Sequence, residues 1–161
     1  MEKEMRIRGL MMDPTTNMPI VVLKDVEGDA VLPIWVGVFE ANAIALEIEK
    51  VTTPRPMTHD LLKNIFLGLE IGVKKVVVTE LREDTFFAVI YAEKNGEPVC
   101  IDSRPSDALA LALRMDCPIF VDETVLKNSK VATAASERVS ADDLRKWLEG
   151  LNDDDMGKYK M

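Results

Sequence analysis

The chain has 161 residues, 47% of them apolar, and carries a formal net charge of −8 at pH 7. This length and apolar content suffice for one hydrophobic core, so we expect one compact domain. Acidic residues outnumber basic ones 28 to 20, which argues against tight non-specific binding of nucleic acid through a broadly basic surface. Part of the acidic excess falls at 153–155, so the rest of the chain is closer to neutral.

The sequence predicts a cytoplasmic protein without a membrane segment. No apolar run is long enough to span a bilayer, and the first six residues lack the apolar core of a signal peptide. Cys100 and Cys117 do not form a close pair, and each lies among apolar residues, which is typical of buried thiols. We therefore expect neither a disulfide nor a thiol-bound metal.

The beginning of the chain predicts an antiparallel β-meander. Runs of β-branched and long apolar residues predict three strands, at 6–12, 20–26 and 31–36. Turn-forming residues separate these runs, namely Asp13 with Pro14 and then Glu27, Gly28 and Asp29. Trp35 lies inside the third apolar run and is predicted to belong to the core.

Two helices are predicted after this meander. Small and apolar residues recur at helical spacing from Ala41 to Ile48, which indicates the first helix. The second begins near Thr58, the expected N-cap, and Asp60 lies in its first turn, where a negative charge suits the helix dipole. The apolar residues of the second helix form one stripe: Leu61, Leu62, Ile65, Phe66 and Leu69.

The second half repeats this order. Strands are predicted at 75–81, 86–93 and 98–101, and Asn95 with Gly96 is a strong hairpin signal. Alanine and leucine alternate from Ala108 to Leu113, which taken alone suggests a strand. Pro105 near a first turn and the poor β-propensity of alanine favour a helix buried on most sides. A short strand at 119–121 and a helical turn at 123–126 follow.

The repeated order predicts an internal duplication. A constant offset of 65 residues places Ala43 on Ala108, and the two units span about 5–65 and 72–125. The predicted fold class is α+β, with duplicated β-meander and helix units in a mainly antiparallel or mixed sheet packed by helices. This domain covers 1–138, and 139–161 are predicted to form a C-terminal helix and an acidic tail. That helix is expected to have Ser140 as its cap and an apolar stripe of Leu144, Trp147, Leu148 and Leu151.

Polar residues concentrate in three short segments where helices are predicted to begin. Four carboxylates, of Glu40, Asp60, Asp102 and Asp107, could hold Mg²⁺ or Mn²⁺, which prefer carboxylate and water oxygen. The planar guanidinium groups of two arginines could bind phosphate, and a serine lies beside one of them; these substrate-binding candidates are Arg55, Arg104 and Ser106.

This combination fits metal-assisted hydrolysis of phosphodiesters. The metal ion would polarise the phosphoryl group and lower the pKa of an attacking water, while His59 or a free carboxylate moves the proton. The catalytic candidates are Asp102, Asp107, His59 and Glu40, and the metal ligands are Asp102, Asp107, Glu40 and Asp60. His59 is the one histidine of the chain, so it cannot belong to a two-histidine metal site.

A structural interpretation of the same residues remains open. Acidic residues in first helical turns stabilise helices without any catalytic role. Arg104 and Asp102 could pair with each other, or they could orient the two packed units. A short edge strand and a helix with apolar residues on several sides also predict a homo-oligomer, most simply a dimer.

Three segments closely resemble the bifunctional nuclease domain family, over roughly residues 5–125. They are 32–37 with 39–41, then 53–62, and finally 102–108. The resemblance implies a nuclease that cleaves DNA and RNA, so nucleic acid is the expected partner. The alternative is a non-catalytic binding or regulatory protein. Its polar segments at the helix starts, which we call the polar elbows, would hold an anion or a protein partner.

Overall fold

The computed structural model describes residues 1–129, which form a mixed seven-stranded sheet and its helices. The strands are β1 (Glu2–Met12), β2 (Pro19–Asp25), β3 (Val31–Trp35), β4 (Gly72–Arg82), β5 (Thr85–Lys94), β6 (Glu97–Ser103) and β7 (Ile119–Asp122). The helices are α1 (Val38–Ile48), α2 (Thr58–Gly68) and α3 (Pro105–Met115), and residues 123–129 are also helical. The predicted α+β class is confirmed.

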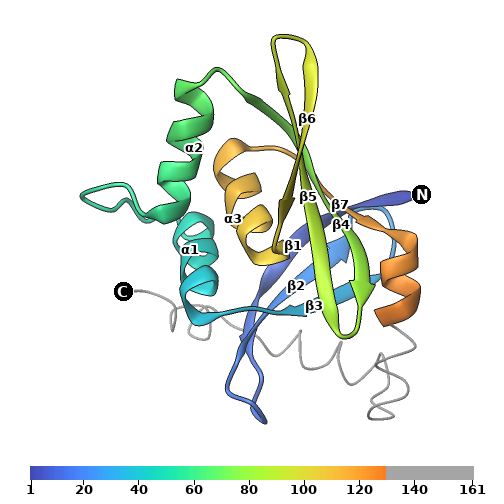
Figure 1. Cartoon of the computed structure of the whole chain (residues 1–161). Coiled ribbons are helices and arrows are strands. Elements are labelled where there is room, and N and C mark those ends of the chain that lie inside the picture. The colour runs from blue at the N-terminus through green and yellow to red at the C-terminus, as the bar shows by residue number, and fades with distance from the viewer. Residues whose placement is uncertain (130–161) are drawn as a thin grey trace.

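The sheet consists of two antiparallel meanders joined by one strand. Its order is β3-β2-β1-β7-β4-β5-β6, and β7 pairs antiparallel with β1 but parallel with β4. Each meander is followed by a helix, α1 or α3, and these two helices pack against each other (Figure 1). Both halves therefore have the same element order, while their origin by duplication stays a prediction.

The β5–β6 hairpin follows directly from its sequence. Asn95 has φ 52° and Gly96 has φ 80°, and positive φ at both central residues is what a two-residue type I′ turn requires. This turn fixes the register in which Ile101 lies opposite Ile90, and thereby decides which side chains of β6 face the core.

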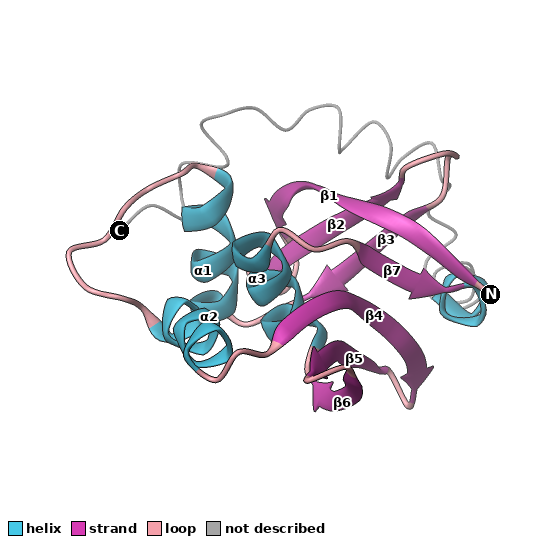
Figure 2. Ribbon diagram, turned by 90° about the horizontal axis from the view of Figure 1, so that it is seen from above, coloured by secondary structure: helices cyan, strands magenta, loops and turns pink. Residues whose placement is uncertain are grey.

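The core lies between the sheet and the pair α1 and α3. Figure 2 shows α1, α2 and α3 gathered on one side of the curved strands. Leu109 and Leu111 of α3 are 0% and 1% exposed although they point to different sides of the helix, and the alanines beside them are equally buried, so α3 is covered on most sides. The prediction of a helix buried on most sides is confirmed for α3, where Pro105 occupies the first turn.

The structure corrects two details of α2. Met57, not Thr58, occupies the N-cap position. Asp60 lies in the first turn as predicted, and its Oδ2 accepts a hydrogen bond from the Met57 N–H at 3.0 Å. The expected apolar stripe is covered only in part. Leu62 and Phe66 pack against the core, whereas three of the five residues are about half exposed: Leu61 at 53%, Ile65 at 46% and Leu69 at 52%.

Trp35 and Cys100 were predicted to be buried, and both predictions are wrong. Trp35 ends the edge strand β3, is 50% exposed and donates its indole N–H to Asp13 Oδ2 at 2.9 Å. Cys100 is exposed because Ile101, the next residue of β6, packs against the core, and neighbouring strand residues face opposite sides. Cys117 is partly buried, and this burial raises its pKa to about 11.

Among residues 1–129, none of the helices combines the length and the apolar character that crossing a membrane requires. The predicted C-terminal helix, with Ser140, Leu144, Trp147, Leu148 and Leu151, lies outside the described residues.

Candidate active site at three helix N-termini

The first turns of α1, α2 and α3 each carry a carboxylate, and each carboxylate contacts an arginine. Glu40 of α1 and Asp107 of α3 both bind Arg104, whereas Asp60 of α2 binds Arg114. A negative charge in the first turn stabilises the helix dipole, which explains why acidic residues occupy these positions. The arginines then neutralise these charges and join one helix to the next.

Arg104 lies at the centre of the first group. Its Nη2 donates to Glu40 Oε1 at 2.6 Å and its Nε to Asp107 Oδ2 at 2.8 Å. These bonds, first to Asp107 and then to Glu40, raise the pKa of Arg104 above its ordinary value, so its charge is permanent. The Arg104 side chain is 65% exposed, and the Glu40 side chain is 15% exposed. The guanidinium is therefore the accessible part of this group.

His59 extends this group into α2. Its Nε2 lies 2.8 Å from Asp107 Oδ1, and His59 is the buried residue of α2, at 8% exposure. Partial burial acts to raise the pKa of Asp107, but the hydrogen bonds from Arg104 and His59 outweigh it and lower the pKa. Asp107 is thus an ionised carboxylate that holds an imidazole on one side and a guanidinium on the other.

The second group joins Asp60 to Arg114, a residue that the sequence analysis did not select. Arg114 Nε donates to Asp60 Oδ1 at 2.7 Å, and the Arg114 side chain is only 3% exposed. Burial acts to raise the pKa of Asp60, but the Met57 N–H and Arg114 outweigh it and lower the pKa. A signal was present: an arginine inside a helix predicted to be buried on most sides must find partners.

Asp102 does not join either group. It pairs with Val89 in the β5–β6 ladder, and alternation turns its side chain away from the core, to which the neighbouring Ile101 belongs. The suggested Asp102–Arg104 pair is not formed, because Arg104 binds Glu40 and Asp107 instead. Ser106 is buried, at 6% exposure, in the first turn of α3.

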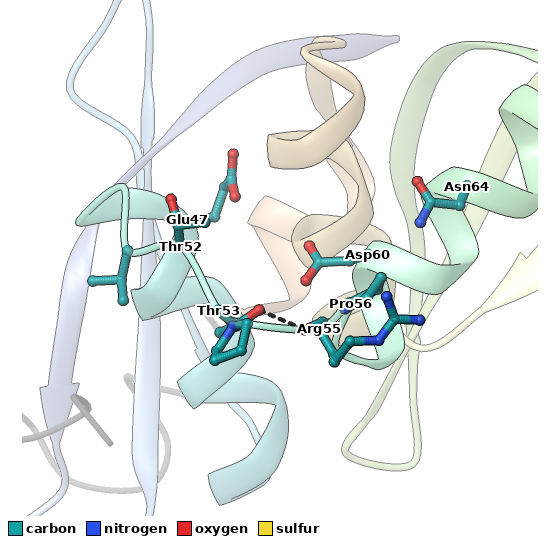
Figure 3. Close-up of a pocket in the computed structure, with 9 residues that line it drawn as sticks. Glu47, Thr52, Thr53, Arg55, Pro56, Asp60 and Asn64 are labelled. Atoms are coloured by element: carbon teal, nitrogen blue, oxygen red, sulfur yellow. Dashed lines mark hydrogen bonds between the residues drawn. The ribbon is translucent and has the colours of Figure 1, made fainter.

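Arg55 lies apart from Arg104, in the loop between α1 and α2. This loop and the neighbouring helix ends line an open pocket of about 310 Å³, which Asp60 also lines (Figure 3). The Thr53 hydroxyl donates to the Arg55 carbonyl at 2.7 Å and shapes the loop. Arg55 is exposed at the pocket, so it is accessible to an anion. Asp60 therefore has the pocket on one side and the buried Arg114 on the other.

The four carboxylates proposed as metal ligands are not assembled into one site. Within residues 1–129, no group of three or more His, Cys, Asp or Glu side chains is placed to hold a metal ion. Glu40 and Asp107 are separated by the guanidinium that binds both, and Asp102 faces the other side of the sheet. The metal-ligand set stays a prediction; in the described residues, the first turns of the helices bring these carboxylates to arginines and not to one another.

A family model described as Bifunctional nuclease domain matches residues 21–134. The chain belongs to the bifunctional nuclease domain family. The match includes all three segments that contribute to the site: Glu40 in the first, His59 in the second, and Arg104 with Asp107 in the third.

Individual relatives match two thirds or more of this chain. An uncharacterized protein of Mycobacterium tuberculosis is 35% identical over 161 residues, which cover 94% of this chain and 96% of that protein. Bifunctional nuclease 1 of Arabidopsis thaliana is 30% identical over 129 residues, or 73% of this chain and 40% of the plant protein. Bifunctional nuclease 1 of Oryza sativa subsp. japonica is 29% identical over 113 residues, or 68% of this chain and 34% of the plant protein. The chain thus spans well under half the length of the plant nucleases.

Proposed function

We propose that this protein is a nuclease that hydrolyses phosphodiester bonds of DNA and RNA at the site formed by His59, Asp107, Arg104 and Glu40. One observation carries the proposal. An imidazole lies 2.8 Å from an ionised carboxylate, beside an exposed guanidinium, in a chain of the bifunctional nuclease domain family. A proton-transfer group, a carboxylate that orients it and an adjacent cation are groups that can together catalyse phosphodiester hydrolysis.

His59 is the proposed proton-transfer group. Asp107 engages its Nε2, so Nδ1 is the ring nitrogen that exchanges a proton with the attacking water or the leaving oxygen. The carboxylate of Asp107 fixes the orientation of the ring and stabilises the imidazolium when His59 takes up that proton. Asp107 is suited to this role because its lowered pKa keeps it ionised at neutral pH.

Arg104 is the proposed phosphate-binding group, and Glu40 holds it in place. Its planar guanidinium can form two parallel hydrogen bonds to a phosphodiester, and its exposed face is open to one. A phosphate must compete with the two carboxylates that already bind Arg104. Two carboxylates and one guanidinium also leave a net negative charge when His59 is neutral. We therefore expect weak substrate binding, in agreement with the acidic composition.

Assistance by Mg²⁺ or Mn²⁺ remains a prediction. The described carboxylates do not form a cluster of three or more ligands, so no catalytic step is assigned to an ion here. An ion that acts in this reaction would need oxygen ligands from the substrate in addition to the protein. A cleavage assay with and without metal ions decides whether the reaction depends on one.

The test uses the full-length protein with end-labelled single-stranded DNA, duplex DNA and RNA of one sequence. Each substrate is incubated with EDTA, Mg²⁺ or Mn²⁺. We expect cleavage by the wild type, a loss of about 100-fold or more in His59→Gln and Asp107→Asn, and unchanged cleavage in Arg82→Lys. Arg82 is a fair control because it lies on β4, paired with Glu80. Absence of cleavage in every condition would overturn the proposal.

The non-catalytic alternative is favoured by a specific observation. Arg104 is exposed, and Glu40 and Asp107 hold its guanidinium in one position, as in a site that binds an anion without cleaving it. In that case the wild type cleaves nothing, and phosphate that binds at Arg104 raises the thermal unfolding midpoint of the protein. That rise should then be lost in Asp107→Asn, because this variant disturbs the position of Arg104.

A further inference from the structure

Arg114 connects the three helices through three different nitrogen atoms. Its Nε donates to Asp60 Oδ1 of α2 at 2.7 Å, and its Nη1 donates to the Ala110 carbonyl of α3 at 2.9 Å. Its Nη2 donates to the Ala43 carbonyl of α1, also at 2.9 Å. A guanidinium this deeply buried is costly unless its donors find acceptors. Here each of the three nitrogens has one acceptor, and each acceptor belongs to a different helix.

The connection matters most for α2, which has little else to hold its first turn. A loop precedes the helix, His59 is its one buried residue, and its stripe of Leu61, Ile65 and Leu69 is about half exposed. Two polar contacts anchor the first turn: Asp60 with Arg114, and His59 with Asp107. Because His59 and Asp60 are neighbours in the chain, the first contact restricts where the second can form.

We propose that Arg114 is a positioning residue: it fixes the first turn of α2 so that His59 Nε2 meets Asp107. Arg114 does not touch the reacting atoms and acts through Asp60. The kinetic consequence rests on the proposed nuclease function, whereas the placement of His59 does not. The guanidinium is needed for its shape as well as its charge. A lysine has one terminal nitrogen and cannot direct separate donors to acceptors on α1, α2 and α3.

Two variants test the connection from opposite ends. Arg114→Lys keeps the charge but loses the three-way geometry. Asp60→Asn leaves the carbonyl partners of Arg114 in place. Its single side-chain oxygen must replace the two that accept from Arg114 and from the Met57 N–H, so the variant weakens the link to α2 and the cap of α2 together. Thr58→Ser is the control for changes near His59, since Thr58 is the exposed residue on its other side. Arg82→Lys is the control for the arginine-to-lysine change on the surface.

The first measurement is independent of catalysis. His59 is the one histidine of the chain, so its imidazole ¹⁵N and C–H signals are unambiguous in NMR spectra of the full-length protein. We expect Arg114→Lys and Asp60→Asn to move these signals in the direction in which Asp107→Asn, which alters the partner itself, moves them. Thr58→Ser and Arg82→Lys should leave the signals near their wild-type positions.

The second measurement is kinetic. A misplaced His59 should lower kcat about tenfold or more in both variants. In Asp60→Asn, KM should change less than about twofold, because Arg114 keeps its contact with α1, which carries Glu40. If the variants are less stable but the His59 signals and kcat keep their wild-type values, Arg114 is structural and the proposal is overturned. Should Arg114→Lys not fold, Asp60→Asn alone decides the outcome. If the wild type cleaves nothing, the nuclease proposal fails, but the NMR result still decides the placement of His59.

Discussion

Gly37 leaves the space that the Glu40 carboxylate occupies. A Cβ added to Gly37 would collide with Glu40 Oε2. The backbone of Gly37, at φ −71° and ψ 158°, is accessible to any residue, so the glycine is not needed for its conformational freedom. The absence of a side chain at Gly37 therefore allows the contact between Glu40 and Arg104.

We expect Gly37→Ala to displace the Glu40 side chain and to break its 2.6 Å contact with Arg104. The free energy of unfolding should fall by about 0.5 to 1 kcal/mol, since Arg104 is largely exposed. A double-mutant cycle with Glu40→Ala, measured by urea unfolding, checks the cause. In the Glu40→Ala background, Gly37→Ala should be nearly neutral, and an undiminished loss there would contradict this explanation.

The ionisation of Asp60 and Asp107 should make the free energy of unfolding depend on pH in acid. The pKa of each is lowered in the folded protein from the ordinary value of 3.8. Each therefore contributes stability that is fully present above pH 4 and is lost as the pH falls through the lowered folded-state pKa. Urea unfolding between pH 2 and pH 7 should show this decline below about pH 4, and Asp107→Asn should flatten it. An equal slope in wild type and variant would show that Asp107 is not a source of the decline.

At the scale of elements, local patterns in the sequence were sufficient to predict the strands and α3. Asn95 and Gly96 accept positive φ and close a hairpin without help from the rest of the fold. The stripe of α2 is different, because amphipathicity shows which side of a helix is apolar but not whether anything covers that side. Leu62 and Phe66 are covered, and Leu61 and Ile65 are largely not.

Because α3 is buried and α2 is partly exposed, truncating a leucine or isoleucine side chain should reduce stability by different amounts in the two helices. Leu109→Ala in α3 removes a fully buried side chain, and we expect it to cost about 3 to 5 kcal/mol. Ile65→Ala in α2 should cost less than about 1 kcal/mol, because the side chain is 46% exposed. Chemical denaturation of both variants provides the comparison. Similar losses in the two variants would mean that the outer side of α2 is covered in solution.

At the scale of the whole molecule, the sequence located the site only in part. Glu40, His59, Arg104 and Asp107 were found because they flank turns and helix starts, which are readable locally. Asp102 was misplaced because the predicted strand ends at residue 101, whereas β6 continues to Ser103 and its alternation turns the Asp102 side chain away from the core. Arg114 was missed because its three acceptors come from three helices, an arrangement that exists only once the helices are packed.

The predicted dimer also belongs to this scale. Both edge strands contain a proline, Pro33 in β3 and Pro98 in β6, and neither proline has an N–H to pair with another strand. Association is therefore not expected to extend the sheet. Light scattering at micromolar concentration should give twice the chain mass of 18.0 kDa. A mass of one chain would contradict the prediction of a dimer.

The central position of β7 has a consequence for biosynthesis. This strand comes last among the seven along the chain, yet it separates β1 from β4 in the sheet. A ribosome must therefore synthesise both meanders and α3 before the strand that unites them exists. Until then the inner edges of β1 and β4 are unpaired, and an unpaired edge can pair with other chains. The nascent protein is thus exposed to misassembly until β7 emerges, and stalled chains that end before Ile119 should be markedly more sensitive to proteases than chains that extend past Asp122.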